Sequence, residues 1–438
     1  MEFLRPWMCR QGRGALRLWA SLFFVCLCAC EEDKVPLTGK REYFLQEPQP
    51  PAPKKGRGAG ATLPPSIPIS SWKQPGYDAA HVLPSIKGPH RFQKVWDENL
   101  YYGEDSSWKI SADPLLADNR LFVLDAGGVL FCLEASTGRL LWKGSVTPEG
   151  FEGNVNAGMV YEAGVLYIAT TFSELVACEG ATGRLLWRRP LEAFASGGMT
   201  LSEGRLFVLL ANNTVEVLDA KTGTLLWTHK GLIEDAKMVG NAACAVQQGI
   251  VIAPYSSGEL FALHAETGDV LWEENLVKIS SSDLSKLLPH IRANPVIFKD
   301  VVYAIGYSGL AAAIDLRTGT RRWEYEIGST ETPCVTKDSL IIVSSEGVCV
   351  CLDLEGHAQW STSLPVKEER SPTLWRGPIM VNGCLLVSHA DGDLVFLSPK
   401  DGRILRTVSL EDPIATRPLI AQGMLFVVTQ NGCVQAYR

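Results

Sequence analysis

Side chains that could do chemistry are few and scattered along this sequence. It has seven histidines, and none of them stands in a His-x-His or His-Glu-x-x-His pair, so a zinc or metalloprotease site has no support. Asp391-Gly-Asp393 resembles part of a calcium loop but lacks the distal glutamate, so we expect a hairpin turn there. A Gly-x-Ser-x-Gly elbow is also missing. The residues therefore predict no catalytic centre and no bound cofactor or metal.

The N-terminus has the layout of an export signal that ends in a lipidation site. Four arginines precede the apolar run Leu18–Leu27, which is short for a membrane span. Leu27-Cys28-Ala29-Cys30 resembles a bacterial lipobox, which implies that residues 1–29 are removed and that Cys30 is acylated. A plain signal peptide cleaved near Ala29, or a short membrane anchor, is the alternative. The acidic Glu31-Glu32-Asp33 that follows favours the lipoprotein, because acyl chains attach a protein without a transmembrane helix.

Cysteines beyond Cys30 are even in number, which permits disulfides in an exported protein. Most of them lie among valine, leucine and phenylalanine. Cys349 and Cys351 would point to the same face of one strand, which is poor disulfide geometry. Disulfides and buried free thiols therefore both remain open, and no Cys-x-x-Cys-His haem motif is present. The eight residues concerned are Cys132, Cys178, Cys244, Cys334, Cys349, Cys351, Cys384 and Cys433.

The chain carries a formal net charge of −7, and residues 1–30 contribute +3, so the mature chain carries −10. An acidic chain without a lysine and arginine stripe is a poor ligand for nucleic acid or anionic headgroups. Residues 30–90 hold the lipidated cysteine and a stretch, Glu47–Pro65, that is dense in proline and glycine. We expect a disordered tether there, with a reach of roughly 40 Å. Gly56-Arg-Gly-Ala-Gly lacks the flanking strand and helix of a phosphate loop.

From residue 91 to 438 the chain repeats itself. Successive copies end in a Thr-Gly-x-x-x-Trp segment or a variant of it, and consecutive tryptophans from Trp142 to Trp360 are 37 to 51 residues apart. This spacing suits a four-stranded propeller blade. Within each copy, short runs of β-branched and aromatic residues alternate with Gly, Asn and Asp turns, which indicates hairpins. We expect the Thr-Gly glycine to adopt a positive φ. We also expect the tryptophans to pack between blades as structural residues: Trp96, Trp142, Trp187, Trp227, Trp272, Trp323 and Trp360.

Both ends of the repeat region are incomplete, and together they give the blade count. The last copy, Thr416–Arg438, supplies three strands, whereas His90–Trp96 is a tryptophan strand with no blade before it. Pairing the two completes one blade and removes two unpaired strand edges. The sequence thus predicts an all-β fold, an eight-bladed β-propeller with four antiparallel strands per blade, closed by the N-terminal strand on the C-terminal blade.

The repeat, as in Leu218–Trp227, is similar to that of the pyrroloquinoline-quinone-type β-propeller superfamily. The stretch from 91 to 438 resembles the BamB family, propeller lipoproteins of the outer-membrane β-barrel assembly machinery, most particularly at Leu310–Trp323, at Gln430–Arg438 and in a long insertion, Val277–Arg292. This resemblance implies a non-catalytic scaffold, lipid-anchored at the periplasmic face of the outer membrane. It would bind the POTRA domains of the barrel-forming subunit, and unfolded outer-membrane proteins, and aid their folding and insertion.

The resemblance also implies that partner contacts lie on the insertion and on the earlier loop Leu232–Gly240. Long loops on a rigid scaffold are where binding residues concentrate. Val239 stands where the family has an arginine, and His290 and Arg292 replace an acidic pair, so the polarity of the interface is lost or reversed. The partner-binding positions carried over are Met238, Leu288, His290 and Arg292.

Three alternatives to this function are compatible with parts of the sequence. A quinoprotein dehydrogenase of the same superfamily would bind quinone and calcium on the central axis, but the chain has no adjacent cysteine pair and no calcium constellation. A propeller that binds peptides or glycans through its central channel stays open. The two loops could also merely cap the edges of their blades.

Overall fold

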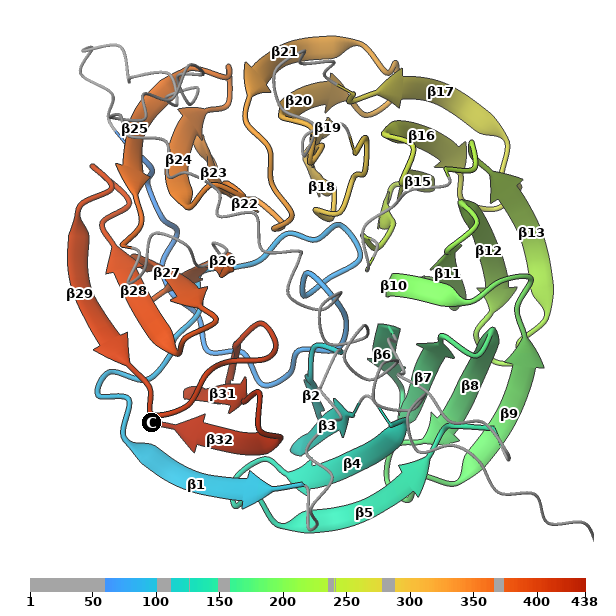
Figure 1. Cartoon of the computed structure of the whole chain (residues 1–438). Helices are drawn as coiled ribbons and strands as arrows, with labels where there is room; N and C mark the ends of the chain where they lie inside the picture. Colours follow the sequence, from blue (N-terminus) through green and yellow to red (C-terminus); the bar gives the residue numbers. More distant parts are fainter. Residues whose placement is uncertain are drawn as a thin grey trace, which may run out of the picture. The chain divides into compact units, whose positions relative to one another are not determined.

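The computed structural model describes residues 60–100, 112–125, 127–148, 158–234, 240, 242–277, 288–365 and 374–438. Every element of regular structure in these ranges is a β-strand, and they contain no helix that could cross a membrane. The strands form eight four-stranded antiparallel sheets, set around a common centre as the blades of a propeller (Figure 1). The predicted all-β fold and the predicted number of blades are confirmed.

The blades are numbered here in chain order. The strands of each blade are given from the centre of the ring to the rim, so that β1, the first strand of the chain, comes last in blade 8. Blades 1 to 4 consist of β2 (Leu115–Ala117), β3 (Arg120–Leu124), β4 (Val129–Glu134) and β5 (Leu140–Ser145); β6 (Gly158–Glu162), β7 (Val165–Thr170), β8 (Glu174–Glu179) and β9 (Leu185–Pro190); β10 (Ala195–Ser202), β11 (Arg205–Leu210), β12 (Thr214–Asp219) and β13 (Leu225–Lys230); and β14 (Ala245–Gln247), β15 (Ile250–Pro254), β16 (Glu259–His264) and β17 (Val270–Asn275). Blades 5 to 8 consist of β18 (Val296–Phe298), β19 (Val301–Ile305), β20 (Leu310–Asp315) and β21 (Arg321–Glu326); β22 (Cys334–Val335), β23 (Ser339–Val343), β24 (Val348–Asp353) and β25 (Ala358–Ser363); β26 (Trp375–Val381), β27 (Cys384–His389), β28 (Asp393–Leu397) and β29 (Ile404–Ser409); and β30 (Leu419–Ala421), β31 (Met424–Val428), β32 (Cys433–Tyr437) and β1 (Lys94–Asn99).

The ring closes in blade 8, where the first strand of the chain pairs with the last. Strand β1 runs antiparallel to β32, with Trp96 opposite Ala436. The pairing extends past both strands, because Gln93 and Arg438 exchange two backbone hydrogen bonds of 2.9 and 2.8 Å. The predicted closure is confirmed, and it joins residues more than 300 positions apart along the chain.

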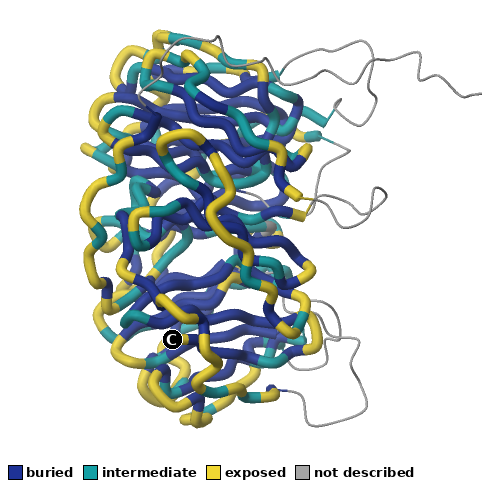
Figure 2. The backbone as a smooth tube through the Cα atoms, turned by 90° about the vertical axis from the view of Figure 1, so that its left-hand side faces the viewer, coloured by how far each residue is buried: buried dark blue, intermediate teal, exposed yellow. Residues whose placement is uncertain are grey.

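Burial follows the position of a strand within its blade. Strand β19 is buried along its whole length, whereas β21, at the rim of the same blade, alternates between exposed and half-buried residues. Inner strands are covered on both faces by the neighbouring blades, which explains their continuous runs of valine, isoleucine and leucine. The exposed residues gather at the turns and rim strands (Figure 2).

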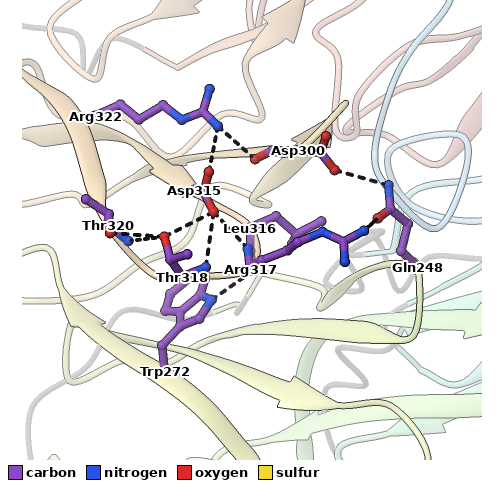
Figure 3. A network of polar contacts seen from close by, with 9 residues as sticks. All are labelled: Gln248, Trp272, Asp300, Asp315, Leu316, Arg317, Thr318, Thr320 and Arg322. Atoms are coloured by element: carbon purple, nitrogen blue, oxygen red, sulfur yellow. Dashed lines mark hydrogen bonds and ion pairs between the residues drawn. The ribbon is translucent and has the colours of Figure 1, made fainter.

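Each rim tryptophan is held by the next blade. Trp272 donates a hydrogen bond from its indole Nε1 to the carbonyl oxygen of Leu316, at 2.8 Å (Figure 3). Gly319 lies under the same ring with φ of +70°, and a Cβ there would stand 2.7 Å from Trp272 Cγ. The glycine is thus required twice, for its backbone conformation and for the space that it leaves. Indole-to-carbonyl bonds of 2.7 to 3.2 Å recur at Trp96, Trp142, Trp227, Trp323 and Trp360, and Trp187 packs on Gly223 in the same way.

A polar network ties the Thr-Gly turn of blade 5 together in Figure 3. The Asp315 carboxylate accepts hydrogen bonds from the backbone and hydroxyl of Thr318, both 3.1 Å, and pairs with Arg322 at 2.7 Å. The hydrogen bond from Arg322 is the main reason that the pKa of Asp315 falls to about 2. From the same turn, Arg317 reaches Gln248 of blade 4 at 3.0 Å, so the network spans two blades.

Residues 60–90 cross the inner ends of the blades, as the blue segment of Figure 1 shows. Trp72 exchanges two backbone hydrogen bonds with Leu116 of blade 1, and Ile86 forms a parallel bridge with Val381 of blade 7. Both side chains are buried. Every other blade also bonds to this segment, through Tyr161 to Lys73, Leu201 to Gln74, Val246 to Ala79, Ile297 to Ala80, Asp338 to Thr62, and Gln422 to Ile69.

The prediction of a disordered tether over 30–90 is therefore wrong for residues 60–90, and residues 30–59 lie outside the described ranges. The segment has no periodic apolar pattern, because it is an irregular extended strip rather than a strand or helix. Its isolated apolar residues, such as Ile69 and Trp72, each fit a separate site on the ring. Its backbone also satisfies the free inner edges of several blades, which would otherwise present unpaired groups.

The eight cysteines in the described ranges are all free thiols. Six of them are buried, and Cys349 and Cys351 lie in β24 with side chains in the interface with blade 7. Of the two possibilities left open by the sequence, the structure shows the free thiols. The turn at Asp391-Gly-Asp393 joins β27 to β28, as expected.

Candidate functional site

Two neighbouring inter-blade connections contain the predicted partner-binding positions. The first runs from β13 to β14 and the second from β17 to β18. Met238, and with it Val239, lies outside the described residues, as does most of the long insertion. Leu288, His290 and Arg292 are described, and they have three different environments.

Leu288 is half-buried, whereas His290 has no exposed surface at all. The carbonyl oxygen of His290 accepts a hydrogen bond of 2.9 Å from Tyr307 at the β19–β20 turn. His290 is followed by Ile291, which is also fully buried. A side chain without exposed surface does not present itself to a partner, so the structure gives no support to the predicted contact through His290.

Arg292 lines the central cavity of the ring, together with Gly240. A Cβ on Gly240 would stand 3.3 Å from Arg292 Nε, so the two connections approach each other closely at this point. The sequence placed Arg292 beside His290 because the two are neighbours along the chain. The structure gives them different environments, since the side chain of His290 has no exposed surface and Arg292 lines the central cavity.

The start of the first connection carries the most exposed aliphatic side chains of the described residues. Leu232 is 65% exposed and Ile233 is 74% exposed. The backbone of Leu232 is held on both sides, because Leu232 donates its N–H to the buried carboxylate of Glu259 at 2.8 Å and its carbonyl accepts a bond from Asn213. Glu259 is fixed in turn by Ser257 at 2.6 Å. The pair therefore stands on a rigid base.

Both connections rest on Tyr255, which is completely buried. Gly231 packs against its ring so closely that a Cβ would stand 2.8 Å from Tyr255 Cδ2, and Ile291 donates its N–H to the Tyr255 carbonyl at 3.3 Å. The Tyr255 hydroxyl bonds to His229 Nδ1 at 2.7 Å. Burial lowers the pKa of His229 and raises that of Tyr255, so both are neutral at physiological pH. We call Leu232, Ile233 and Leu288 the paired-loop surface.

The sequence predicted this loop but not these two residues of it. Leu232 and Ile233 follow the rim strand almost directly. From the sequence alone, two apolar residues at this position are indistinguishable from the last residues of that strand. The signal that could have identified them is their position after the last residue of the blade, Lys230, and the glycine at 231. Aliphatic residues placed beyond a completed blade have no blade to pack into.

Nucleophilic and metal-binding chemistry finds little support among the described residues. They contain no group of three His, Cys, Asp or Glu side chains close enough to hold a metal ion. Burial raises the pKa of the thiols of Cys132, Cys178, Cys244, Cys334 and Cys351 to about 12, which leaves them protonated and unreactive.

Comparison with known proteins agrees with the architecture. A family model described as outer membrane protein assembly factor BamB matches residues 92–161, 145–362 and 345–438. The chain belongs to the BamB family. The family relationship predicted from the repeat and the insertion is thereby confirmed, and the matched segments together span the propeller from β1 to β32.

Individual relatives are distant in sequence. An outer membrane protein assembly factor BamB from Yersinia pestis is 23% identical over 363 residues, which cover 81% of this chain and 91% of the relative. The structure of BamB from Moraxella catarrhalis superposes with a TM-score of 0.67 at 19% identity, covering 79% of this chain and 99% of that one. A quinohemoprotein alcohol dehydrogenase from Comamonas testosteroni gives a TM-score of 0.64 at 13% identity, with 85% and 81% covered, which shows a shared fold alone.

Proposed function

We propose that this protein is a non-catalytic scaffold lipoprotein of the outer-membrane β-barrel assembly machinery. It is attached by an acylated Cys30 to the periplasmic face of the outer membrane, binds the POTRA domains of the barrel-forming subunit, and aids the folding and insertion of outer-membrane proteins. Family membership supports the assembly role, since relatives from Yersinia pestis and Escherichia coli are named as outer membrane protein assembly factors. None of these relatives is named as an enzyme.

The paired-loop surface carries the binding proposal. Exposed aliphatic side chains on a rigid base suit a protein partner, because little conformational entropy is lost when such a surface is covered. Burying an aliphatic side chain completely contributes ~1.5–3 kcal/mol. Leu232 and Ile233 are 65% and 74% exposed, so together they could contribute ~2–4 kcal/mol to binding.

The test is co-purification of POTRA domains with the Leu232→Asp/Ile233→Asp double variant. We expect its affinity to fall ~30-fold or more, because two carboxylates would have to be desolvated in place of two aliphatic groups. Leu374→Asp is the matched control, since Leu374 is a 50% exposed aliphatic residue just before β26, in another inter-blade connection. Wild-type recovery by a folded double variant would show that this surface does not bind the subunit.

The role of the long insertion is tested by a deletion that leaves the buried residues at its end in place. Removing residues 279–286 keeps His290 and Ile291, both fully buried, and so keeps the base of the loop. We expect a folded propeller with weakened recovery of the POTRA domains. If recovery is unchanged here but lost in the double variant, the first connection alone carries the contact.

Two further experiments test the anchor and the absence of catalysis. Cys30→Ala should abolish incorporation of radiolabelled palmitate and release the protein from membranes. Incubation of the purified protein with quinone and calcium should produce no bound cofactor absorbance. A quinone spectrum that stays with the protein through gel filtration would favour the dehydrogenase alternative.

A further inference from the structure

The centre of the ring contains a cavity of about 530 Å³. Its lining comes from the segment Trp72–Gly76, which crosses the inner ends of the blades, and from the residues that lead into or begin the innermost strands. Glycines 158, 197 and 198 line it without side chains, whereas arginines line it from blades 5, 7 and 8 and acidic residues line it from blades 1 and 6. A cavity of this volume falls within the range of small-ligand sites, ~300–1,000 Å³.

Three arginines and two carboxylates line this cavity, but the carboxylates are already engaged. Glu331 accepts hydrogen bonds from Arg417 Nη2 at 2.8 Å and from the Gly377 backbone at 3.0 Å. Asp113 accepts one from the Arg417 backbone N–H at 3.0 Å. Within the described part of the chain, Arg376 donates to a carbonyl oxygen, that of Ala415, at 2.7 Å, and to no carboxylate. Both acids thus serve Arg417 or the backbone.

Arg292 is the unpaired member of this group. It is half-buried, and among the residues that the structure describes no hydrogen-bond acceptor or carboxylate pairs with its guanidinium. Burial lowers its pKa, Glu331 opposes that shift, and Arg376 and Arg417 add to the lowering. An arginine nevertheless stays protonated in a protein, so the lining holds three cations against the two carboxylates Asp113 and Glu331, and Arg292 has no direct hydrogen bond to either acid.

Three buried polar atoms of residues in this lining have no hydrogen-bond partner. Arg376 Nε, Arg417 Nε and the Thr416 hydroxyl are buried and have no partner. Unpaired buried polar atoms are rare and costly in folded proteins, and each needs an explanation. Because these three atoms have no exposed surface, they do not themselves contact a ligand, and Arg292, which is only half-buried, is the donor that a bound group could reach.

We propose that the central cavity is a binding site for the carboxylate at the end of a peptide chain, with Arg292 as its main ligand. The planar guanidinium matches a carboxylate through two parallel N–H···O bonds. Arg376, which pairs with no carboxylate in the described part of the chain, lies in the same lining as a second donor.

A peptide is favoured as the occupant because the ring already binds one at this position. The chain's own residues 67–86 run past the centre as an extended strip and pair through their backbone with Leu116, Tyr161, Val246 and Val381 in or beside the innermost strands. This is recognition of an extended chain by strand edges. Trp72 and Gln74 of this strip line the cavity together with Arg292, so a peptide bound in the cavity would lie beside the strip and within the same lining as the guanidinium.

The experiment is calorimetric titration of the mature protein with three probes: N-acetyl-trialanine with a free carboxylate, the same peptide as its C-terminal amide, and succinate. We expect saturable, salt-sensitive binding of the free acid and at least ~10-fold weaker binding of the amide, since the charge-assisted bonds are lost. Succinate shares the carboxylate but lacks the peptide backbone. Succinate weaker than the peptide acid would support the chain-end assignment, whereas succinate binding equally well would overturn it in favour of a small organic acid.

Variants assign the binding to Arg292. Arg292→Gln should weaken the peptide acid ~10-fold or more, and Arg292→Lys should restore part of the affinity, because it keeps the charge but not the fork. Arg403→Gln, which removes an exposed charge from the β28–β29 turn, should bind like the wild type. Since Arg292 holds no partner, its loss should leave the melting temperature close to that of the wild type. Equal affinity for acid and amide, an unaffected Arg292→Gln, or no saturable binding at millimolar peptide would overturn the proposal.

Discussion

Replacing Gly319 by alanine tests how the blades are joined. Gly319 has a φ of +70°, and the new Cβ would stand 2.7 Å from Trp272 Cγ and 2.8 Å from Trp272 Cβ. A left-handed conformation costs a residue with a Cβ ~1–2 kcal/mol. Displacing the Trp272 ring adds ~1–3 kcal/mol of overpacking and strains its hydrogen bond to Leu316. The variant should therefore lose ~2–5 kcal/mol of unfolding free energy.

Gly204→Ala separates the two contributions. Gly204 has nearly the same φ, +71°, in the β10–β11 turn, but a Cβ there would meet no atom within 4 Å. It should lose only the ~1–2 kcal/mol of backbone strain. Urea denaturation followed by circular dichroism gives both values under one set of conditions, and the difference between the two variants measures the contact with Trp272. If Gly319→Ala lost no more stability than Gly204→Ala, the packing of tryptophan on the next blade's turn would not be what holds neighbouring blades together.

Three further predictions concern the N-terminal segment, the Thr-Gly turn and the thiols. Trp72→Ala should cost ~3–5 kcal/mol in urea denaturation, because the side chain is buried against the ring, whereas a deletion confined to residues 31–58 should leave stability unchanged. Asp315→Asn should cost up to ~1 kcal/mol. Because the folded pKa of Asp315, about 2, lies below its ordinary value of 3.8, this stabilisation is complete above about pH 4 and is lost as the pH falls through about 2, which acid denaturation of both proteins would reveal. Native-state alkylation followed by mass spectrometry should modify Cys384, which is partly exposed, well before Cys244, whose pKa burial raises to about 12; equal rates would contradict the buried assignment.

Blade architecture was predictable because its determinants are local. A Thr-Gly turn, a rim tryptophan and short apolar runs recur within each 37 to 51 residue copy, and each copy forms its own sheet. Even the closure of the ring followed from counting strands, since the orphan strand at Trp96 and the three-stranded last copy each lacked a partner. The loops were predictable for the same reason, because these segments are longer than the connection that two successive blades require.

Residue environments at the centre of the ring were decided only by the tertiary structure. Arg292, Arg376 and Arg417 come from three blades and stand together only because the innermost strands of the blades begin around one common centre. Residues 60–90 carry no period, and they are ordered because the closed ring offers inner strand edges and separate apolar sites to bind them. His290 and Arg292 lie two residues apart, yet the first is fully buried and the second lines the central cavity, while the backbone at this loop end is bonded to Tyr255 and Tyr307. The period of the sequence determines the structure of each blade. Which residues of different blades come into contact at the centre is decided only when the ring closes.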